Sequence, residues 1–142
     1  MAIVYFDSSA LVKLLVEEDG TDLVAQLWDG CDAAVSSRLA YPEVRAALAA
    51  AHRNHTLDAN GHEAALRIWE EFWSATRPVE LRPEVERHAG ELAQRHSLRG
   101  ADAVHLASAL TVPATELIVA VWDRRLHAGA HAEGLATAPD SI

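Results

Sequence analysis

Short apolar runs alternate with longer stretches of helical periodicity along the whole chain. In the longer stretches apolar residues return every three or four positions, which is typical of amphipathic helices. Because short apolar strands separated by helices favour parallel pairing, the pattern predicts a three-layer α/β/α sandwich around a parallel sheet of four or five strands. The predicted strands are residues 3–6, 33–35, 79–81, 117–122 and 135–137.

The helical stretches have recognisable beginnings. Pro42 stands in a first turn, where proline is favoured, and we expect Thr21 and Asp58 to cap the helices that start beside them. No linker, low-complexity run or internal repeat divides the chain, so we expect a single domain over residues 1–142. The predicted helices are residues 9–17, 21–29, 41–53, 58–75, 83–96, 101–110 and 124–131.

Two acids directly follow predicted strands. Asp7 comes after the strand at 3–6, and Asp123 comes after the strand at 117–122. Binding sites of parallel sheets gather at the carboxyl ends of the strands. We therefore expect Asp7 and Asp123 to meet in space, although 116 positions separate them.

Glu43 and Asp102 stand in the first turns of predicted helices. Taken alone, each is explained by the favourable interaction of an acid with a helix N-terminus. In the predicted fold, however, both project toward the same edge of the sheet as Asp7 and Asp123. Carboxylates that crowd together raise one another's pKa, and a divalent cation offsets that cost. An all-oxygen ligand set selects Mg²⁺ or Mn²⁺.

The charge balance narrows the classes of partner. The chain carries 12 basic and 21 acidic residues, a net charge of −9, which argues against a large nonspecific nucleic-acid footprint. It is compatible with a nuclease whose acids are partly neutralised by metal. Four cations flank the acidic motifs and are candidates for holding phosphates, with the equal alternative that they balance nearby carboxylates. They are Lys13, Arg99, Arg124 and Arg125.

Several other kinds of site are disfavoured. The single cysteine, Cys31, excludes an internal disulfide and a Cys-based zinc site. His127 and His131 have the spacing of a helical metal pair but lack a third ligand, so we expect both at the surface. His105 stands three residues after Asp102 and could face the same crevice, but we expect a packing role for it. No apolar run is long enough to span a bilayer, so we expect a cytoplasmic protein without membrane contact.

Four stretches resemble the acidic motifs of the PIN-domain ribonucleases, most nearly those of the VapC toxins of prokaryotic type II VapBC toxin–antitoxin modules. They are VYFDSSALVKLL, YPEV, LRGADAVHLASAL and VAVWDRRLHAGA, in that order along nearly the whole chain. The resemblance implies a catalytic acidic quartet that binds Mg²⁺ or Mn²⁺. By position its members are Asp7, Glu43, Asp102 and Asp123, with Ser9, and Ser8 as a second candidate, supplying a supporting hydroxyl behind the first acid.

One position departs from the pattern of that family. Val121 stands two residues before the fourth acid, where many relatives carry Thr or Ser. The resemblance therefore leaves open whether Asp123 binds the metal directly or acts through another residue.

The resemblance implies a metal-dependent endoribonuclease toxin that hydrolyses RNA phosphodiester bonds. It also implies a homodimer and a cognate antitoxin that inserts into the acidic cleft. The net negative charge leads us to expect a structured RNA substrate, tRNA or rRNA, rather than bulk RNA. Two alternatives stay open: a PIN nuclease that processes RNA or acts on DNA without being a toxin, and a non-catalytic α/β binding module.

Overall fold

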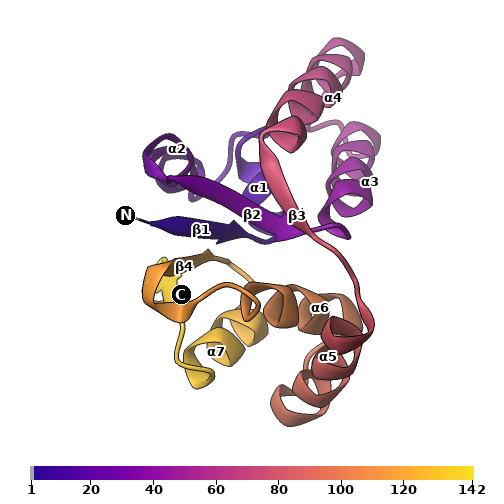
Figure 1. Cartoon of the computed structure of the whole chain (residues 1–142). Coiled ribbons are helices and arrows are strands. Elements are labelled where there is room, and N and C mark those ends of the chain that lie inside the picture. Colours follow the sequence, from indigo (N-terminus) through magenta and orange to yellow (C-terminus); the bar gives the residue numbers. More distant parts are fainter. Residues whose placement is uncertain (1) are drawn as a thin grey trace.

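The structure, a computed structural model, describes residues 2–142. Within these residues a five-stranded sheet lies between two sets of helices (Figure 1). The strands are β1 (Ile3–Phe6), β2 (Ala33–Ser37), β3 (Thr76–Val79), β4 (Leu117–Ala120) and β5 (Ala136–Ala138). The helices are α1 (Ser8–Lys13), α2 (Thr21–Gly30), α3 (Ala40–Arg53), α4 (Ala59–Ser74), α5 (Pro83–His96), α6 (Gly100–Ala109) and α7 (Arg124–Ala132), with a short 3₁₀ turn η1 (Ala114–Glu116) before β4.

The strand order is β3-β2-β1-β4-β5, and every pairing is parallel. The chain leaves β1 for β2 on one side and returns to β4 on the other, so a crevice opens at the carboxyl ends of β1 and β4. The register pairs Phe6 with Ala120, and the backbone N–H of Asp7 donates to the Ala120 carbonyl at 3.3 Å. The residues that follow β1 and those that follow β4 therefore lie side by side.

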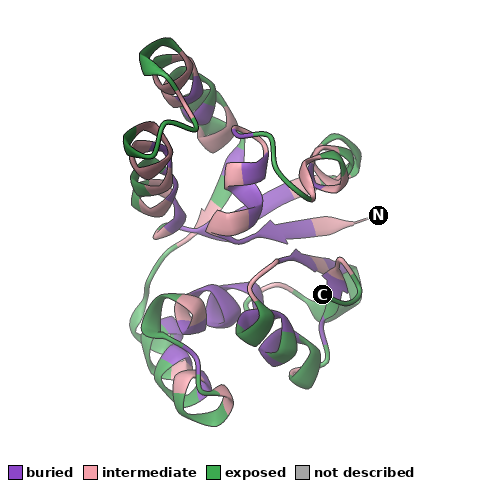
Figure 2. Ribbon diagram, turned by 180° about the vertical axis from the view of Figure 1, so that it is seen from behind, coloured by how far each residue is buried: buried purple, intermediate pink, exposed green. Residues whose placement is uncertain are grey.

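The two faces of the sheet carry separate apolar cores. Val4 and Phe6 face the core built with α1 to α4, while Tyr5 faces the core built with α5 to α7, as the alternation of side chains along a strand requires. Figure 1 shows the two groups of helices on opposite sides of the sheet, and Figure 2 shows buried residues along the strands and on helix surfaces that face them. The arrangement confirms the predicted three-layer sandwich. Among residues 2–142 no helix combines the length and apolarity needed to cross a membrane.

Two predicted elements have a boundary that is wrong by three residues or more. The strand expected at 79–81 is Thr76–Val79, because an edge strand accepts Pro78 where a central strand would lose a ladder hydrogen bond. The helix expected at 9–17 ends at Lys13, because the next residues form tighter i→i+3 bonds, among them Leu14 N–H to the Leu11 carbonyl at 3.1 Å. Asp58, by contrast, caps α4 as predicted, since it accepts from the Gly61 N–H at 2.7 Å.

α2 starts at Thr21 as predicted, and its cap residue is the neighbouring Gly20. Gly20 has a φ of 94°, in the left-handed region that favours glycine. A Cβ at this position would lie 2.7 Å from the ring of Trp122. Both the backbone and the available space therefore require glycine here, and the indole of Trp122 packs directly against the start of α2.

Candidate active site

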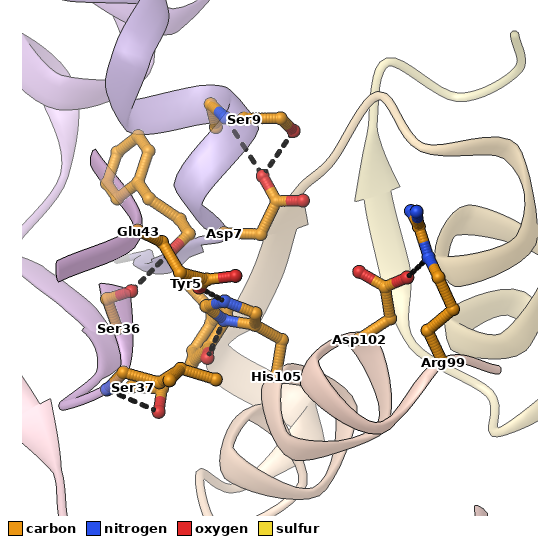
Figure 3. A network of polar contacts seen from close by, with 12 residues as sticks. Tyr5, Asp7, Ser9, Ser36, Ser37, Glu43, Arg99, Asp102 and His105 are labelled. Carbon is orange, nitrogen blue, oxygen red and sulfur yellow. Dashed lines mark hydrogen bonds and ion pairs between the residues drawn. The ribbon is translucent and has the colours of Figure 1, made fainter. Parts of the chain in front are cut away.

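Asp7 caps α1 at the point where the chain leaves β1. Its Oδ1 accepts from the Ser9 hydroxyl at 2.7 Å and from the Ala10 N–H at 2.9 Å. The residue is only 4% exposed, and this burial raises the pKa of its carboxyl against the lowering effect of His105 and the two hydrogen bonds. Figure 3 shows the other carboxylate oxygen pointing into the space between Asp7 and Asp102. Ser9 is therefore the supporting hydroxyl that the resemblance implied.

Glu43 lies in the first turn of α3 and is held by His105 of α6. The distance from His105 Nε2 to Glu43 Oε1 is 2.6 Å, and the distance from His105 Nδ1 to the Tyr5 hydroxyl is 2.7 Å (Figure 3). A carboxylate only accepts, so Nε2 carries a proton, and in the neutral ring Nδ1 accepts from the Tyr5 O–H. Burial, with a further contribution from the charge of Asp7, raises the pKa of Tyr5 well above 10.0, which keeps that phenol protonated.

His105 is buried as a packing role requires, and it also makes polar contacts within the site. It is 2% exposed, in keeping with a packing role, but both ring nitrogens join a chain of polar contacts that ends at Glu43. The available signal was its spacing from Asp102, because residues three apart on a helix share a face. That spacing directs both side chains toward the crevice.

Asp102 and Asp123 share one cation, Arg99. Its Nε donates to Asp102 Oδ2 at 3.2 Å, and one terminal nitrogen donates to Asp123 Oδ2 at 3.5 Å. The Arg99 side chain is 77% exposed. Asp123 caps α7 and accepts from the Leu126 N–H at 2.9 Å. The helix N-terminus thus supports Asp123 where Val121, which is buried, has no hydroxyl to offer.

The four acids line a single pocket of about 340 Å³. Ser8, Ser9, Arg99 and Ala101 complete its lining. The predicted convergence of Asp7 with Asp123 at one sheet edge is therefore observed. Within residues 2–142, however, no group of three or more His, Cys, Asp or Glu side chains is arranged to hold a metal ion unaided. Each acid also has a protein partner: Ser9 and Ala10 contact Asp7, His105 contacts Glu43, and Arg99 contacts both Asp102 and Asp123.

The basic candidates divide into two groups. Lys13 is buried, pairs with Glu18 at 3.0 Å and lies 4.9 Å from the centre of the Trp122 ring, so it balances a carboxylate and does not line the pocket. The other three candidates line a second cavity that adjoins the acid pocket. They are Arg99, Arg124 and Arg125.

His127 also departs from expectation. It is 7% exposed, and its Nε2 contacts the Pro139 carbonyl at 2.7 Å, whereas His131 is exposed as predicted. The prediction of a surface position for His127 is wrong because the chain segment after β5 covers that part of α7.

Residues 4–128 match the PIN domain family. The chain belongs to the PIN-domain family. Two relatives are each 68% identical to it over 142 residues, which covers 100% of this chain and 99% of the relative. They are Ribonuclease VapC45 and Ribonuclease VapC49, from the Mycobacterium tuberculosis strains CDC 1551 and H37Rv respectively. Identity at this level over the full chain places it among the VapC-type PIN ribonucleases and confirms the resemblance.

Solved structures share the PIN fold at much lower identity. PAE2754 from Pyrobaculum aerophilum has a TM-score of 0.71 at 20% identity, covering 97% of this chain and 90% of that one. VapC20 from Mycobacterium tuberculosis, described as a sarcin-ricin loop cleaving toxin, has a TM-score of 0.65 at 16% identity, covering 94% of this chain and 96% of that one. VapBC2 from Rickettsia felis, bound to a DNA fragment from its promoter, has a TM-score of 0.62 at 11% identity, covering 95% of this chain and 96% of that one. At these identities the likeness shows the fold.

Proposed function

We propose that this PIN domain, spanning residues 1–142, is a Mg²⁺- or Mn²⁺-dependent endoribonuclease toxin that hydrolyses phosphodiester bonds in a structured RNA, tRNA or rRNA. The observation that carries the proposal is the single pocket lined by Asp7, Glu43, Asp102 and Asp123. The names of the relatives at 68% identity support the same activity. A non-catalytic binding module would have no use for four acids at one sheet edge.

The donor set fits a hard divalent cation, because all four acids offer oxygen ligands. Burial raises the pKa of the Asp7 carboxyl. A nearby cation would act in the opposite direction, because positive charge favours the ionised form. We assign the metal to Asp7, Glu43, Asp102 and Asp123, with Arg99 competing for the oxygens of the last two. Bound there, the ion supplies a more acidic water and offsets charge on the phosphate oxygens.

The chain's own groups orient the reactants. Glu43, held by His105, and Asp102 are the two candidates to orient the attacking water or accept its proton. Ser9 and the start of α1 fix one oxygen of Asp7 and leave the other directed into the crevice. Arg99, Arg124 and Arg125 offer guanidinium groups to the phosphates of the RNA.

The direct test is an RNA cleavage assay with the purified protein. It should cut a structured RNA in the presence of Mg²⁺ or Mn²⁺, and EDTA should stop the cleavage. Asp7→Asn and Asp102→Asn should abolish cutting while circular dichroism and thermal unfolding show a folded chain. Asp58→Asn is the matched control, because Asp58 caps α4 outside the pocket and Asn retains that cap. Full activity of either pocket variant refutes the assignment.

Substrate class needs its own comparison. The same assay with DNA of identical sequence separates a ribonuclease from a DNA-cleaving PIN nuclease. Calorimetric titration with Mn²⁺ separates both from a binding module, since a chain that binds no Mn²⁺ is not the enzyme proposed here.

The proposed partners are a cognate antitoxin and a second copy of the chain. Solved VapBC and toxin–antitoxin complexes share this fold, which supports an antitoxin partner. Co-expression with the product of an adjacent small gene should yield a co-purifying complex with suppressed cleavage. Light scattering after size-exclusion chromatography should give the mass of a dimer.

A further inference from the structure

A second cavity of about 540 Å³ adjoins the acid pocket. Its lining residues are Arg99, Asp102, Trp122, Asp123, Arg124 and Arg125. Three of these, Arg99, Asp102 and Asp123, also line the acid pocket, so the two spaces share a wall. The second cavity adds one aromatic ring, from the connection between β4 and α7, and two guanidinium groups, from the first turn of α7.

The two added arginines are available to an anion. Arg124 and Arg125 are exposed, and within residues 2–142 neither forms an ion pair, whereas Arg99 contacts two acids. In a chain with a net charge of −9 they gather positive charge directly beside the acid pocket. A guanidinium matches the geometry of phosphate oxygens through paired N–H donors.

Gly20 and Lys13 hold the Trp122 ring in place. Gly20 packs so closely that a Cβ would lie 2.7 Å from the indole, and the Lys13 ammonium lies 4.9 Å from the ring centre. Lys13 is itself fixed by Glu18 at 3.0 Å. The ring is therefore preorganised, and it is only partly buried because the remainder lines the cavity. A fixed aromatic ring beside phosphate-binding groups is the arrangement on which nucleic-acid bases stack.

We propose that this second cavity is a nucleotide subsite. It takes the nucleotide that adjoins the scissile phosphate, with the base against Trp122 and the phosphate on Arg124 and Arg125. The proposal rests on the ribonuclease function proposed above and adds where the RNA strand continues beyond the acids. Because Trp122, Asp123 and Arg124 are consecutive, the turn that positions the fourth acid also positions the subsite.

The test does not depend on catalysis. The indole N–H signal of Trp122 in a ¹⁵N-labelled NMR spectrum is assigned from its loss in Trp122→Phe. Ribonucleoside 5′-monophosphates at millimolar concentration should shift that signal. Inorganic phosphate alone and an uncharged nucleoside alone should each shift it less, because each engages only half of the subsite.

Paired variants locate the phosphate contact. Arg124→Ser/Arg125→Ser should reduce the nucleotide-induced shift of Trp122 to the size that the uncharged nucleoside gives. Arg87→Ser is the matched control, because Arg87 is an exposed arginine on α5 outside both cavities, and it should retain the full shift. An unmoved Trp122 signal overturns the proposal, as does a shift that is undiminished in the double variant.

A kinetic measurement then separates the subsite from the nuclease. Trp122→Leu should raise KM for RNA by about tenfold, the low end of what one stacked base contributes, with a smaller change in kcat. If nucleotides shift Trp122 but no RNA is cut, the subsite stands and the nuclease proposal fails. If RNA is cut and KM is unchanged in Trp122→Leu, the nuclease proposal stands and the subsite fails.

Discussion

The acid pocket has two halves that are stabilised differently. Asp7 and Glu43 are held by a hydroxyl, a backbone N–H and a nearly inaccessible imidazole. In the other half, the Leu126 N–H holds Asp123 Oδ1, but the Oδ2 atoms of Asp102 and Asp123 are bridged only by an arginine whose side chain is 77% exposed. Solvent screens an exposed ion pair, so such a pair contributes little stability and reforms easily. A hydrogen bond shielded from water is costly to leave unmade. The first half is thus fixed by the fold, and the second half is free to exchange its partner.

The largest expected effect on the cleavage rate comes from a change in the half that contains Asp7 and Glu43. Asp7→Asn keeps an acceptor for Ser9 and Ala10 but removes the charge, so the fold should persist while cleavage falls by about 10³-fold or more. Single-turnover RNA cleavage at saturating Mn²⁺ measures the loss. A residual rate within tenfold of the wild type would falsify the central role given to this acid.

The next effect tests the support behind Glu43. His105→Leu leaves the Tyr5 hydroxyl and the Glu43 carboxylate without their partner, which should cost about 1–3 kcal/mol in unfolding free energy. Cleavage should fall by roughly 10- to 100-fold through kcat, because the contact from His105 orients the Glu43 carboxylate. His105→Gln, which offers a side-chain N–H again, should recover part of kcat. Equal kcat values in the Leu and Gln variants would show that His105 contributes packing and does not orient Glu43.

A smaller effect concerns the pH dependence of stability. Burial raises the pKa of Asp7 in the folded chain above its ordinary value of 3.8. Between those two values the folded chain holds the extra proton, so its stability falls as pH rises through that interval, by about 1.4 kcal/mol for each pKa unit. At neutral pH Asp7→Asn should therefore be more stable than the wild type in urea unfolding. The difference should shrink as pH falls through that interval and stay small below pH 3.8; a difference independent of pH contradicts the burial argument.

The smallest effect on stability is expected in the exchangeable half. Arg99→Ala removes two exposed ion pairs and should change the unfolding free energy by less than about 1 kcal/mol. Because Arg99 competes with a cation for the oxygens of Asp102 and Asp123, its removal should tighten Mn²⁺ binding in calorimetry. Arg87→Ala controls for loss of one positive charge. Weaker Mn²⁺ binding in Arg99→Ala would show that the arginine assists the metal instead of competing with it.

The sequence was informative where a residue's role follows from local position. Asp7 and Asp123 come directly after strands, and parallel strands bring their carboxyl ends to one edge whatever lies between them. It was less informative where the partner comes from another element. The contact between His105 and Glu43 joins two helices. The position of Lys13 over the Trp122 ring depends on tertiary packing around Gly20. Helical periodicity predicts which face is buried, but not which polar group that face meets.

The pairing of β4 with β1 determines when the acid pocket can form during synthesis of the chain. The first and fourth acids are 116 positions apart, so a nascent chain on the ribosome carries Asp7 long before Asp123 has been synthesised. A fragment that stops before β4 lacks both the strand that pairs with β1 and the acid and arginines that follow it. The acid pocket therefore forms only after β4 and the residues that follow it have been synthesised.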